Sequence, residues 1–318
     1  MSVRKLIIAQ NLEHTYVERI RAVIPEWEVI VGRDREVWLD HISEAEVIAG
    51  WKKVMADHIG SGRLKWVQTW SAGIDTLPLN ILKNHNVALT NATGVHAFPI
   101  SETIFALMLG LTRKLHSYVR NQQAKTWYHS DLKLEIHNKT IGILGIGAIG
   151  QETAKIAKAF GMEVLGLRHS GKQDKYVDRM YKTEELNDML PLCDYVVVTL
   201  PLTKETHHLI GKEQFKRMKD TAFFINIGRG ILVVEDDLMS ALQSGEIAGA
   251  GLDVFETEPL PESSALWELE NVIVTPHTAG STQHYDERVV NDIFIPNLKI
   301  YLNGDHPAIN LVDYKKGY

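Results

Sequence analysis

The stretch "GILGIGAIGQ", residues 142–151, is the feature that most constrains the fold of this chain. It places Gly145, Gly147 and Gly150 in the spacing GxGxxG, directly after the strand-like run "KTIGIL". The amphipathic segment "QETAKIAKAFG" and a second apolar run, "EVLGL", follow. Glycines between a strand and a helix let the backbone approach a pyrophosphate, which rests on the N–H groups of the helix start. The stretch therefore predicts a dinucleotide-binding βαβ unit; the alternative is a tight turn without a ligand.

The second strand of this unit ends in an unexpected residue. A dinucleotide site usually carries an acidic residue about 20 positions beyond its first glycines, where it binds the ribose hydroxyls. Here "LRHS" places Arg168, His169 and Ser170 at that position. A guanidinium offers charge-assisted donors to a phosphate and has no acceptor for a hydroxyl. We therefore predict that NADP is the preferred cofactor and that NAD binds more weakly; the alternative is that Arg168 extends from the strand end into solvent.

Short apolar runs alternate with helix-like segments on both sides of this unit, which is the pattern of parallel sheets with crossover helices. At 318 residues the chain is comfortable for two such domains. Between them, residues 101–121 are predicted to form one long helix with Ser101 as its N-cap. The nearly continuous apolar residues from Ile104 to Leu111 predict that this helix is buried between two bodies.

Composition excludes several functions. The formal net charge is -6, with acids and bases interspersed, which argues against nucleic-acid binding. The most apolar helical stretch is too short to span a bilayer, and the N-terminal stretch "MSVRKLIIAQNLEH" lacks the core and cleavage site of a signal peptide.

The single cysteine, Cys193, fits a reducing compartment and favours a buried structural thiol over a reactive one. His207 and His208 lack zinc-ligand spacing, so no metal site is expected. We expect a cytoplasmic protein without a membrane or nucleic-acid partner.

Three motifs in the second half of the chain carry groups suited to catalysis. "NIGRG" places Arg229 between two glycines, "GLDVFETEPLP" contains Asp253 and Glu258, and "NVIVTPHTAG" puts His277 directly after a strand candidate. A guanidinium can bind both oxygens of a carboxylate, and imidazole exchanges protons near neutral pH. Each motif alone also fits a structural role, as a surface salt bridge, a solvated acidic loop or a packed histidine. Their combination is what indicates an active site.

Together with "SAGID" (residues 71–75) and "TGVHAFPISE" (residues 93–102), these motifs resemble the D-isomer-specific 2-hydroxyacid dehydrogenase family, in its order and spacing over nearly the whole chain. The resemblance implies an α/β protein of two doubly wound parallel-sheet domains, a Rossmann cofactor domain inserted into a flavodoxin-like substrate domain. It puts the substrate domain at residues 1–100 and 285–318, the cofactor domain at residues 101–284, and the active site in the cleft. It also implies a homodimer built through the cofactor domain.

The same resemblance implies an NADP-preferring reductase that converts a small 2-oxo acid into the D-2-hydroxy acid, with glyoxylate and hydroxypyruvate among the candidates. Arg229 would bind the substrate carboxylate and His277 would donate the proton. Glu258 would orient the imidazole and favour its protonated form. Formate dehydrogenases of the family pair the histidine with glutamine, so Glu258 argues against that activity. A cofactor-sensing, corepressor-like binding protein on the same fold stays the alternative.

The resemblance also assigns residues around the two ligands. The N–H groups of Ala72 and Gly73 would contact the substrate carboxylate. Trp51 and His96 would border the substrate side chain, or else pack in the core or at the rim. Asp253 would lie near the nicotinamide amide. The cofactor-binding residues implied in this way are Gly145, Gly147, Ala148, Ile149, Gly150, Arg168, His169, Ser170, Leu200, Pro201, Thr206, Ile227, Gly228, Arg229, Asp253, His277 and Gly280.

Overall fold

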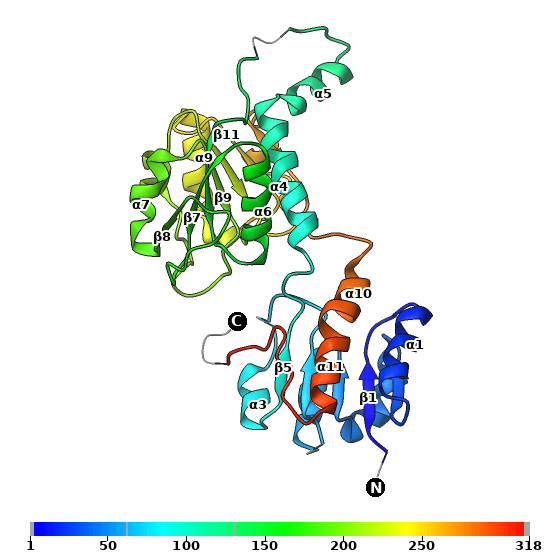
Figure 1. The fold of residues 1–318 in the computed structure, drawn as a ribbon. Coiled ribbons are helices and arrows are strands. Elements are labelled where there is room, and N and C mark those ends of the chain that lie inside the picture. The colour runs from blue at the N-terminus through cyan, green and yellow to red at the C-terminus, as the bar shows by residue number, and fades with distance from the viewer. Residues whose placement is uncertain (1–2, 62, 75, 130–131, 315–318) are drawn as a thin grey trace. The chain divides into compact units, whose positions relative to one another are not determined.

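The computed structural model of the protein describes residues 3–61, 63–74, 76–129 and 132–314. Asp75, the last residue of the "SAGID" motif, lies outside the described residues. The chain divides into two compact units (Figure 1). Unit 1 comprises Met1–Val95 and Thr282–Tyr318, and unit 2 comprises His96–Ser281. Unit 2 is therefore inserted into the sequence of unit 1.

Unit 1 is built on a five-stranded parallel sheet with the order β2-β1-β3-β4-β5. Its strands are β1 (Lys5–Ile8), β2 (Glu28–Val31), β3 (Val47–Ala49), β4 (Trp66–Gln68) and β5 (Ala88–Thr90). This order is that of flavodoxin-like doubly wound sheets. The central strands are buried along their length, as expected for a parallel sheet that is covered on both faces.

Helices cover both faces of this sheet. They are α1 (His14–Val23), α2 (Arg35–Trp38), α3 (Leu79–Asn84), α10 (Tyr285–Arg288) and α11 (Ile295–Leu302). A π-helical stretch, Val289–Phe294, joins α10 and α11 into one continuous helix (Figure 1). On one face, Ile20 of α1 and Leu298 of α11 pack against β1, and on the other face Trp38 and Leu82 belong to a second core cluster. The core of unit 1 therefore consists of an apolar layer on each side of the sheet.

Unit 2 contains a seven-stranded parallel sheet with the order β12-β11-β10-β9-β6-β7-β8. Its strands are β6 (Thr140–Leu144), β7 (Glu163–Leu167), β8 (Arg179–Tyr181), β9 (Tyr195–Val198), β10 (Phe223–Asn226), β11 (Gly249–Leu252) and β12 (Val272–Val274). The two parallel sheets confirm the predicted fold class. Sequence reasoning missed β8, because its three residues include only one fully buried side chain and give no apolar run.

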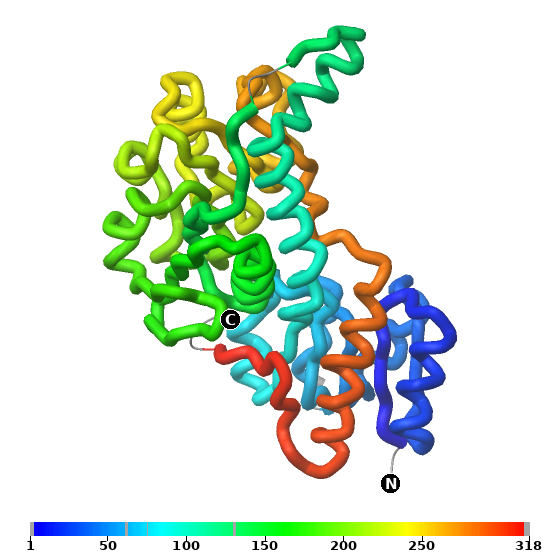
Figure 2. The backbone as a smooth tube through the Cα atoms, turned by 45° about the horizontal axis from the view of Figure 1, so that its top comes forward, coloured from blue at the N-terminus to red at the C-terminus, as the bar shows by residue number. Residues whose placement is uncertain are grey.

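The helices of unit 2 also form two layers. They are α4 (Ala97–Thr112), α5 (Leu115–Gln123), α6 (Ala148–Ala159), α7 (Leu186–Met189), α8 (Lys212–Arg217) and α9 (Glu235–Ser244). One core cluster lies under α4 and α6, which run side by side in both views (Figures 1 and 2). The other cluster contains residues of α7, α8 and α9. No helix among the described residues is long and apolar enough to cross a bilayer.

The prediction of a single helix over residues 101–121 was wrong. The chain forms α4 and α5 instead, and Lys114 between them has a left-handed φ of 53°. The helix begins at Ala97, so Ser101 is not its N-cap; its buried hydroxyl donates to the Phe98 carbonyl at 2.8 Å. Pro99 explains this earlier start, because the first turn of a helix tolerates a residue without an N–H.

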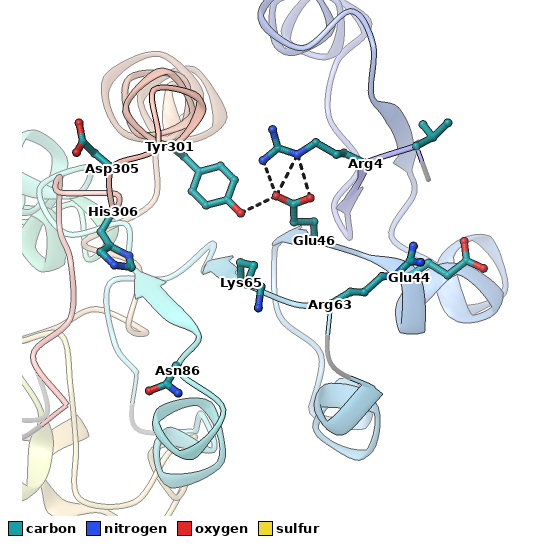
Figure 3. A pocket seen from close by; sticks show the side chains of 11 residues that line it. Arg4, Glu44, Glu46, Arg63, Lys65, Asn86, Tyr301, Asp305 and His306 are labelled. Atoms are coloured by element: carbon teal, nitrogen blue, oxygen red, sulfur yellow. Dashed lines mark hydrogen bonds and ion pairs between the residues drawn. The ribbon is translucent and has the colours of Figure 1, made fainter. Parts of the chain in front are cut away.

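A hollow of about 590 Å³ lies in unit 1, where the chain enters the strands (Figure 3). Two of its charged side chains pair with each other: Arg4 Nε donates to both oxygens of Glu46, at 3.1 and 2.9 Å, and Tyr301 also donates to Glu46, at 2.6 Å. None of the predicted site residues lines it. In a parallel sheet the loops that follow the strands emerge at the opposite edge, which is where doubly wound proteins bind their ligands.

Candidate active site

The loops at the carboxyl edge of the unit 2 sheet carry the predicted cofactor and catalytic residues. The glycine loop follows β6, Arg168 follows β7 and Leu200 follows β9, whereas Arg229 follows β10 and His277 comes after β12. The chain order reverses between β6 and β9, which are neighbours in the sheet. Doubly wound sheets bind dinucleotides at such a reversal. The topology therefore places the candidate cofactor loop beside a row of candidate catalytic groups.

The glycine loop fits a pyrophosphate. Gly145 has a φ of 109°, which favours glycine, and a Cβ on Gly150 would lie 2.1 Å from the Gly145 carbonyl oxygen. Gly147 is the N-cap residue of α6, and a Cβ there would meet no atom within 4 Å, so this side of the loop is open. Thr199 Oγ1 donates to the Gly145 carbonyl at 2.6 Å and holds the turn. An open backbone at a helix start is what a bound phosphate requires.

Arg168 stands directly after β7, with His169 and Ser170 exposed beside it. Its main-chain N–H donates to the Tyr181 carbonyl at 2.9 Å, which fixes the backbone against β8. Within the described part of the chain, no hydrogen bond or ion pair of the Arg168 guanidinium occurs. The guanidinium is therefore free to bind an anion.

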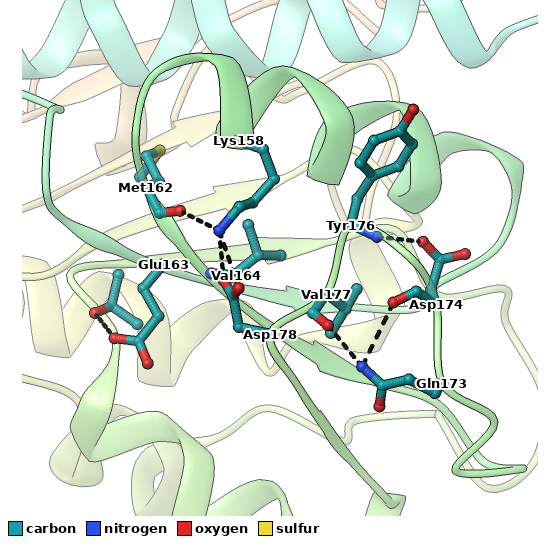
Figure 4. A network of polar contacts seen from close by, with 10 residues as sticks. Lys158, Met162, Glu163, Val164, Gln173, Asp174, Tyr176, Val177 and Asp178 are labelled. Atoms are coloured by element: carbon teal, nitrogen blue, oxygen red, sulfur yellow. Dashed lines mark hydrogen bonds and ion pairs between the residues drawn. The ribbon is translucent and has the colours of Figure 1, made fainter.

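A polar network anchors the far end of the loop that begins at Arg168 (Figure 4). Asp178 accepts hydrogen bonds from Lys158 Nζ and from the Val164 N–H, both at 2.8 Å. Burial raises the pKa of the Asp178 carboxyl, but these hydrogen bonds and the Lys158 charge outweigh it and leave the pKa below its usual value. Gln173 Nε2 also donates to the Val177 carbonyl at 2.6 Å. The loop thus returns to a fixed point beside β7.

Arg229 lies on a turn that the sequence holds tightly. Asn226 is buried at the end of β10, where its side chain accepts from the Gly228 N–H at 3.1 Å and donates to the Arg229 carbonyl at 3.2 Å. A Cβ on Gly230 would lie 1.9 Å from the Phe255 carbonyl carbon, which explains the glycine after the arginine. The exposed Arg229 side chain donates to the Gly228 carbonyl at 2.7 Å. The turn is fixed, and the cation faces outward.

Glu258 and His277 form a direct pair. His277 Nδ1 lies 2.7 Å from Glu258 Oε2, and Glu258 Oε1 accepts from the Phe255 N–H at 3.1 Å. Burial raises the pKa of Glu258. The hydrogen bonds from His277 and Phe255, together with the Arg229 charge, lower it by more than burial raises it, so the pKa lies below its usual value. Nε2 of His277 has no hydrogen-bond partner among the described residues. Glu258 therefore orients the ring and leaves one nitrogen for a ligand.

Asp253 is buried and holds the loop that carries His277. One of its carboxylate oxygens accepts from Thr275 Oγ1 at 2.6 Å and from the Thr278 N–H at 3.0 Å, and the other accepts from the Ala279 N–H at 3.0 Å. His277 lies inside this loop with a φ of 52°. An unusual backbone angle of this kind persists where surrounding contacts impose it. Asp253 supplies those contacts.

The remaining cofactor candidates lie on turns next to this row. Thr206 Oγ1 donates to the Pro201 carbonyl at 2.8 Å and so closes the turn after β9. Ala148 and Ile149 begin α6, and Ile227 is buried after β10. His96 Nδ1 lies 2.9 Å from the Gly280 carbonyl oxygen, so both belong to one contact. Their roles in cofactor binding stay predictions.

Trp51 fits both of the roles expected for it, packing in the core and contact with the substrate. It packs against the unit 1 core cluster that contains Trp38, which favours a structural role. Its indole N–H is buried and has no hydrogen-bond partner in the described part of the chain. Buried donors normally have a partner, so a substrate contact also fits.

In unit 1, Ala72 and Gly73 follow β4 at the carboxyl edge of that sheet. Every main-chain carbonyl from Trp70 to Gly73 accepts a hydrogen bond. The donors are Tyr285 OH to Trp70 at 2.8 Å, Thr69 Oγ1 to Ser71 at 2.7 Å, Asn91 Nδ2 to Ala72 at 3.1 Å, and Ser71 Oγ to Gly73 at 2.8 Å. The N–H groups of Ala72 and Gly73 donate to no described residue. Adjacent free N–H groups of this kind suit an anion.

Sequence reasoning missed the residues that hold these loops. Thr199, Asn226 and Asn91 each bind a main-chain group of a loop that carries predicted site residues. All three stand at or just after the end of a buried strand, and that position was the available signal. Cys193 was predicted correctly as a buried thiol: it is fully buried, and burial raises its pKa to about 12.

Comparisons with known proteins relate this chain to one family. The model of the D-isomer specific 2-hydroxyacid dehydrogenase NAD binding domain matches residues 105–279. The chain is 37% identical over 297 residues to glyoxylate/hydroxypyruvate reductase B of Pectobacterium carotovorum, which covers 90% of this chain and 92% of that protein.

Two solved structures extend the similarity to nearly the whole fold. A D-isomer specific 2-hydroxyacid dehydrogenase family protein from Aeromonas salmonicida has a TM-score of 0.84 and 33% identity, covering 98% of this chain and 100% of that one. An NADPH-dependent glyoxylate/hydroxypyruvate reductase from Sinorhizobium meliloti, in complex with NADP and sulfate, has a TM-score of 0.82 and 28% identity, covering 99% of this chain and 100% of that one.

Proposed function

The chain belongs to the D-isomer specific 2-hydroxyacid dehydrogenase family, and on that premise we propose that it reduces small 2-oxo acids to D-2-hydroxy acids, with NADPH as the preferred hydride donor. Its relatives support an oxidoreductase that uses a nicotinamide cofactor on 2-oxo acids. Glyoxylate and hydroxypyruvate are the substrates that we expect first. The observation that carries the proposal is the 2.7 Å contact between His277 and Glu258.

This contact prepares a proton donor. The carboxylate of Glu258 is ionised at neutral pH, since its pKa is lowered, and it stabilises a protonated imidazole. Because Nδ1 of His277 is engaged, Nε2 is the nitrogen that gives its proton to the substrate carbonyl oxygen. A reduced nicotinamide cofactor, when bound, supplies the hydride to the carbonyl carbon. The carbonyl then becomes an alcohol, and the imidazole regains its proton from solvent.

Arg229 would bind the substrate carboxylate through its exposed guanidinium. The free N–H groups of Ala72 and Gly73 would bind the same carboxylate, and Trp51 and His96 would border the substrate side chain. In domain terms, we assign substrate binding to residues 1–100 and 285–318 and cofactor binding to residues 101–284.

The preference for NADPH rests on Arg168. Its guanidinium has no partner in the described part of the chain, and it stands where an acidic residue would otherwise bind the ribose hydroxyls. His169 and Ser170 would add donors to the 2′-phosphate. The Sinorhizobium meliloti relative, whose structure holds NADP, supports the same choice. We place the nicotinamide amide near Asp253, which would then serve the cofactor as well as the His277 loop.

We also propose a cytoplasmic homodimer built through unit 2. Helix α5 has no buried residue, and its Leu115 and Val119 are more than half exposed, as are Trp127 and Tyr128 beyond it. Exposed apolar side chains that cluster on one segment favour a protein interface. Val119→Asp should shift the mass measured by light scattering from a dimer to a monomer. A monomeric parent protein would overturn this proposal.

The test of the activity is the change in 340 nm absorbance with NADPH and a panel of 2-oxo acids. We expect turnover of roughly 10 per second with at least one small 2-oxo acid. With hydroxypyruvate, whose reduction creates a stereocentre, the product should be the D-isomer when assayed by chiral chromatography. Tight NADPH binding without turnover of any 2-oxo acid would contradict the proposal and favour a cofactor-sensing binding protein.

A further inference from the structure

The loop of residues 70–73 in unit 1 is held by a second turn, residues 91–93. Asn91 is only 6% exposed, and its side chain contacts both turns. Its Nδ2 donates to the Ala72 carbonyl at 3.1 Å, and its Oδ1 accepts from the Thr93 N–H at 3.0 Å. The Ala92 N–H adds a bond of 3.0 Å to the Ser71 carbonyl. The orientation of the 70–73 loop therefore depends on where the 91–93 turn lies.

Asn310, near the end of the described chain, holds the 91–93 turn through hydrogen bonds. Nδ2 of Asn310 donates to the Thr93 carbonyl at 2.7 Å and to the Asn91 carbonyl at 3.2 Å. The main-chain carbonyl of Asn310 accepts from the Asn91 N–H at 3.2 Å. The φ of Asn310 is 55°, a left-handed angle that asparagine tolerates better than most residues. One residue thus binds the turn through both its side chain and its backbone.

The segment that carries Asn310 is itself fixed within unit 1. After α11 the chain turns back toward β5, as the red segment in Figure 1 shows. Asn297 of α11 is fully buried, and its Oδ1 accepts from the Ala308 and Ile309 N–H groups at 3.0 and 2.8 Å. Beyond Asn310, the Val312 N–H donates to the Leu89 carbonyl at 2.8 Å. Contacts on both sides hold Asn310 in place.

We infer that Asn310 is a positioning residue for the substrate carboxylate, acting through Asn91 on the N–H groups of Ala72 and Gly73. This inference rests on the proposed function, because it takes the 2-oxo acid carboxylate as the anion. Main-chain donors bind an anion strongly only when their direction is set before binding, since ordering them afterwards costs part of the interaction. The hydrogen bonds to the carbonyls of the 70–73 loop set that direction. Asn310 contributes by holding the 91–93 turn from which Asn91 donates to this loop.

Two variants of Asn310 test this role. Asn310→Gly keeps the left-handed backbone and removes both side-chain donors, and Asn310→Asp keeps the size but offers no donor to the two carbonyls. We expect KM for the 2-oxo acid to rise about five- to tenfold in both, the loss expected for a hydrogen bond or two. The dissociation constant of NADPH should not change, because the proposed cofactor residues all belong to unit 2.

The matched control is Asn86, also in unit 1, with a φ of 54° and no side-chain hydrogen bond to a described residue. Asn86→Gly and Asn86→Asp should leave KM for the 2-oxo acid as in the parent. Hydrogen–deuterium exchange of the peptide over residues 91–95 gives a readout without turnover. It should become faster in the Asn310 variants, because the 91–93 turn loses its brace, and not in the Asn86 variants.

The outcomes separate the two proposals. An active parent whose KM and exchange are unchanged in both Asn310 variants would overturn the role of Asn310 and leave the proposed function intact. KM that rises equally for the 2-oxo acid and for NADPH would also overturn it, since general destabilisation would then explain the loss. A parent that reduces no 2-oxo acid would overturn the proposed function and, with it, the carboxylate as the anion.

Discussion

Unit 1 and unit 2 share a doubly wound parallel sheet, but the loops at their carboxyl edges present different groups. In unit 2 the exposed groups are ionisable side chains, Arg229, Glu258 and His277. In unit 1 the candidate groups are the main-chain N–H groups of Ala72 and Gly73. The polar side chains around them donate to the main-chain carbonyls of the same loop. The groups of unit 2 supply protons and full charges, whereas those of unit 1 supply main-chain donors whose direction is set by the fold.

This difference has a consequence for mutagenesis. Where a side chain performs the chemistry, truncating it removes the function. Where the backbone binds the ligand, truncating a neighbouring side chain only loosens the geometry, and the donors stay. We therefore expect large effects from single substitutions in unit 2 and graded effects in unit 1.

The largest effect is expected for Arg229→Ala. Loss of a charge-assisted, bidentate contact should cost about 3–4 kcal/mol of transition-state binding, or about 150-fold to about a thousandfold in kcat/KM for the 2-oxo acid. Arg229→Lys should recover only part, because an ammonium lacks the planar fork. Steady-state kinetics with NADPH measures both, and Arg217→Ala on the exposed side of α8 is the control. An Arg229→Ala enzyme within about threefold of the parent would remove Arg229 from the site.

The next effect concerns the response of the Glu258–His277 pair to pH. Reduction needs a protonated imidazole, so its rate falls as the pH rises, and the Glu258 carboxylate stabilises that proton. Although burial raises the pKa of Glu258, its hydrogen bonds keep it below the usual value, so the carboxylate is charged throughout the neutral range. Glu258→Gln removes the charge and keeps a hydrogen-bonding group. The fall in kcat/KM should therefore begin at a lower pH than in the parent.

Profiles of kcat/KM against pH for the parent and for Glu258→Gln measure this shift directly. If the two profiles coincide, Glu258 does not tune His277. Glu256→Gln is a suitable control, because Glu256 lies on the same loop and pairs with His208 rather than with His277.

Arg168→Asp should change the choice of cofactor rather than catalysis. A charge-assisted hydrogen bond to the 2′-phosphate is worth roughly 1.5–3 kcal/mol, which predicts a ten- to hundredfold preference of the parent for NADPH. The carboxylate repels the phosphate and accepts from ribose hydroxyls, so the preference should reverse, chiefly through KM for the cofactor. Equal kcat/KM with NADH and NADPH in the parent would show that Arg168 does not bind the phosphate.

The smallest effect is expected for Ser71→Ala in unit 1. Ser71 Oγ donates to the Gly73 carbonyl at 2.8 Å, and its removal leaves the N–H donors in place. We expect KM for the 2-oxo acid to rise about two- to threefold, in keeping with the loss of one exposed hydrogen bond. Ser240→Ala, which removes a similar side-chain bond in α9, should change nothing. A Ser71→Ala enzyme as impaired as Arg229→Ala would end the contrast between the two units.

The helix after the first unit shows where local sequence signals were insufficient. Residues 101–121 read as one helix because their apolar residues are continuous, and Ser101 resembles an N-cap. The structure begins the helix at Ala97, buries Ser101, and breaks the helix at Lys114. The missed strand β8 has the same origin, since a three-residue edge strand is stabilised by its pairing with β7 rather than by an apolar pattern.

The sequence by itself determined the fold class, the glycine loop, the family and the ionisable candidates Arg168, Arg229, Glu258 and His277. These signals are local: a strand, a turn and a helix follow one another, and a charged side chain keeps its chemistry wherever the fold places it. The tertiary structure alone decided that Asp253 holds the His277 loop and that Asn91 and Asn310 hold the 70–73 loop. Such contacts join residues far apart in the chain, and the direction of a main-chain N–H depends on all of them at once.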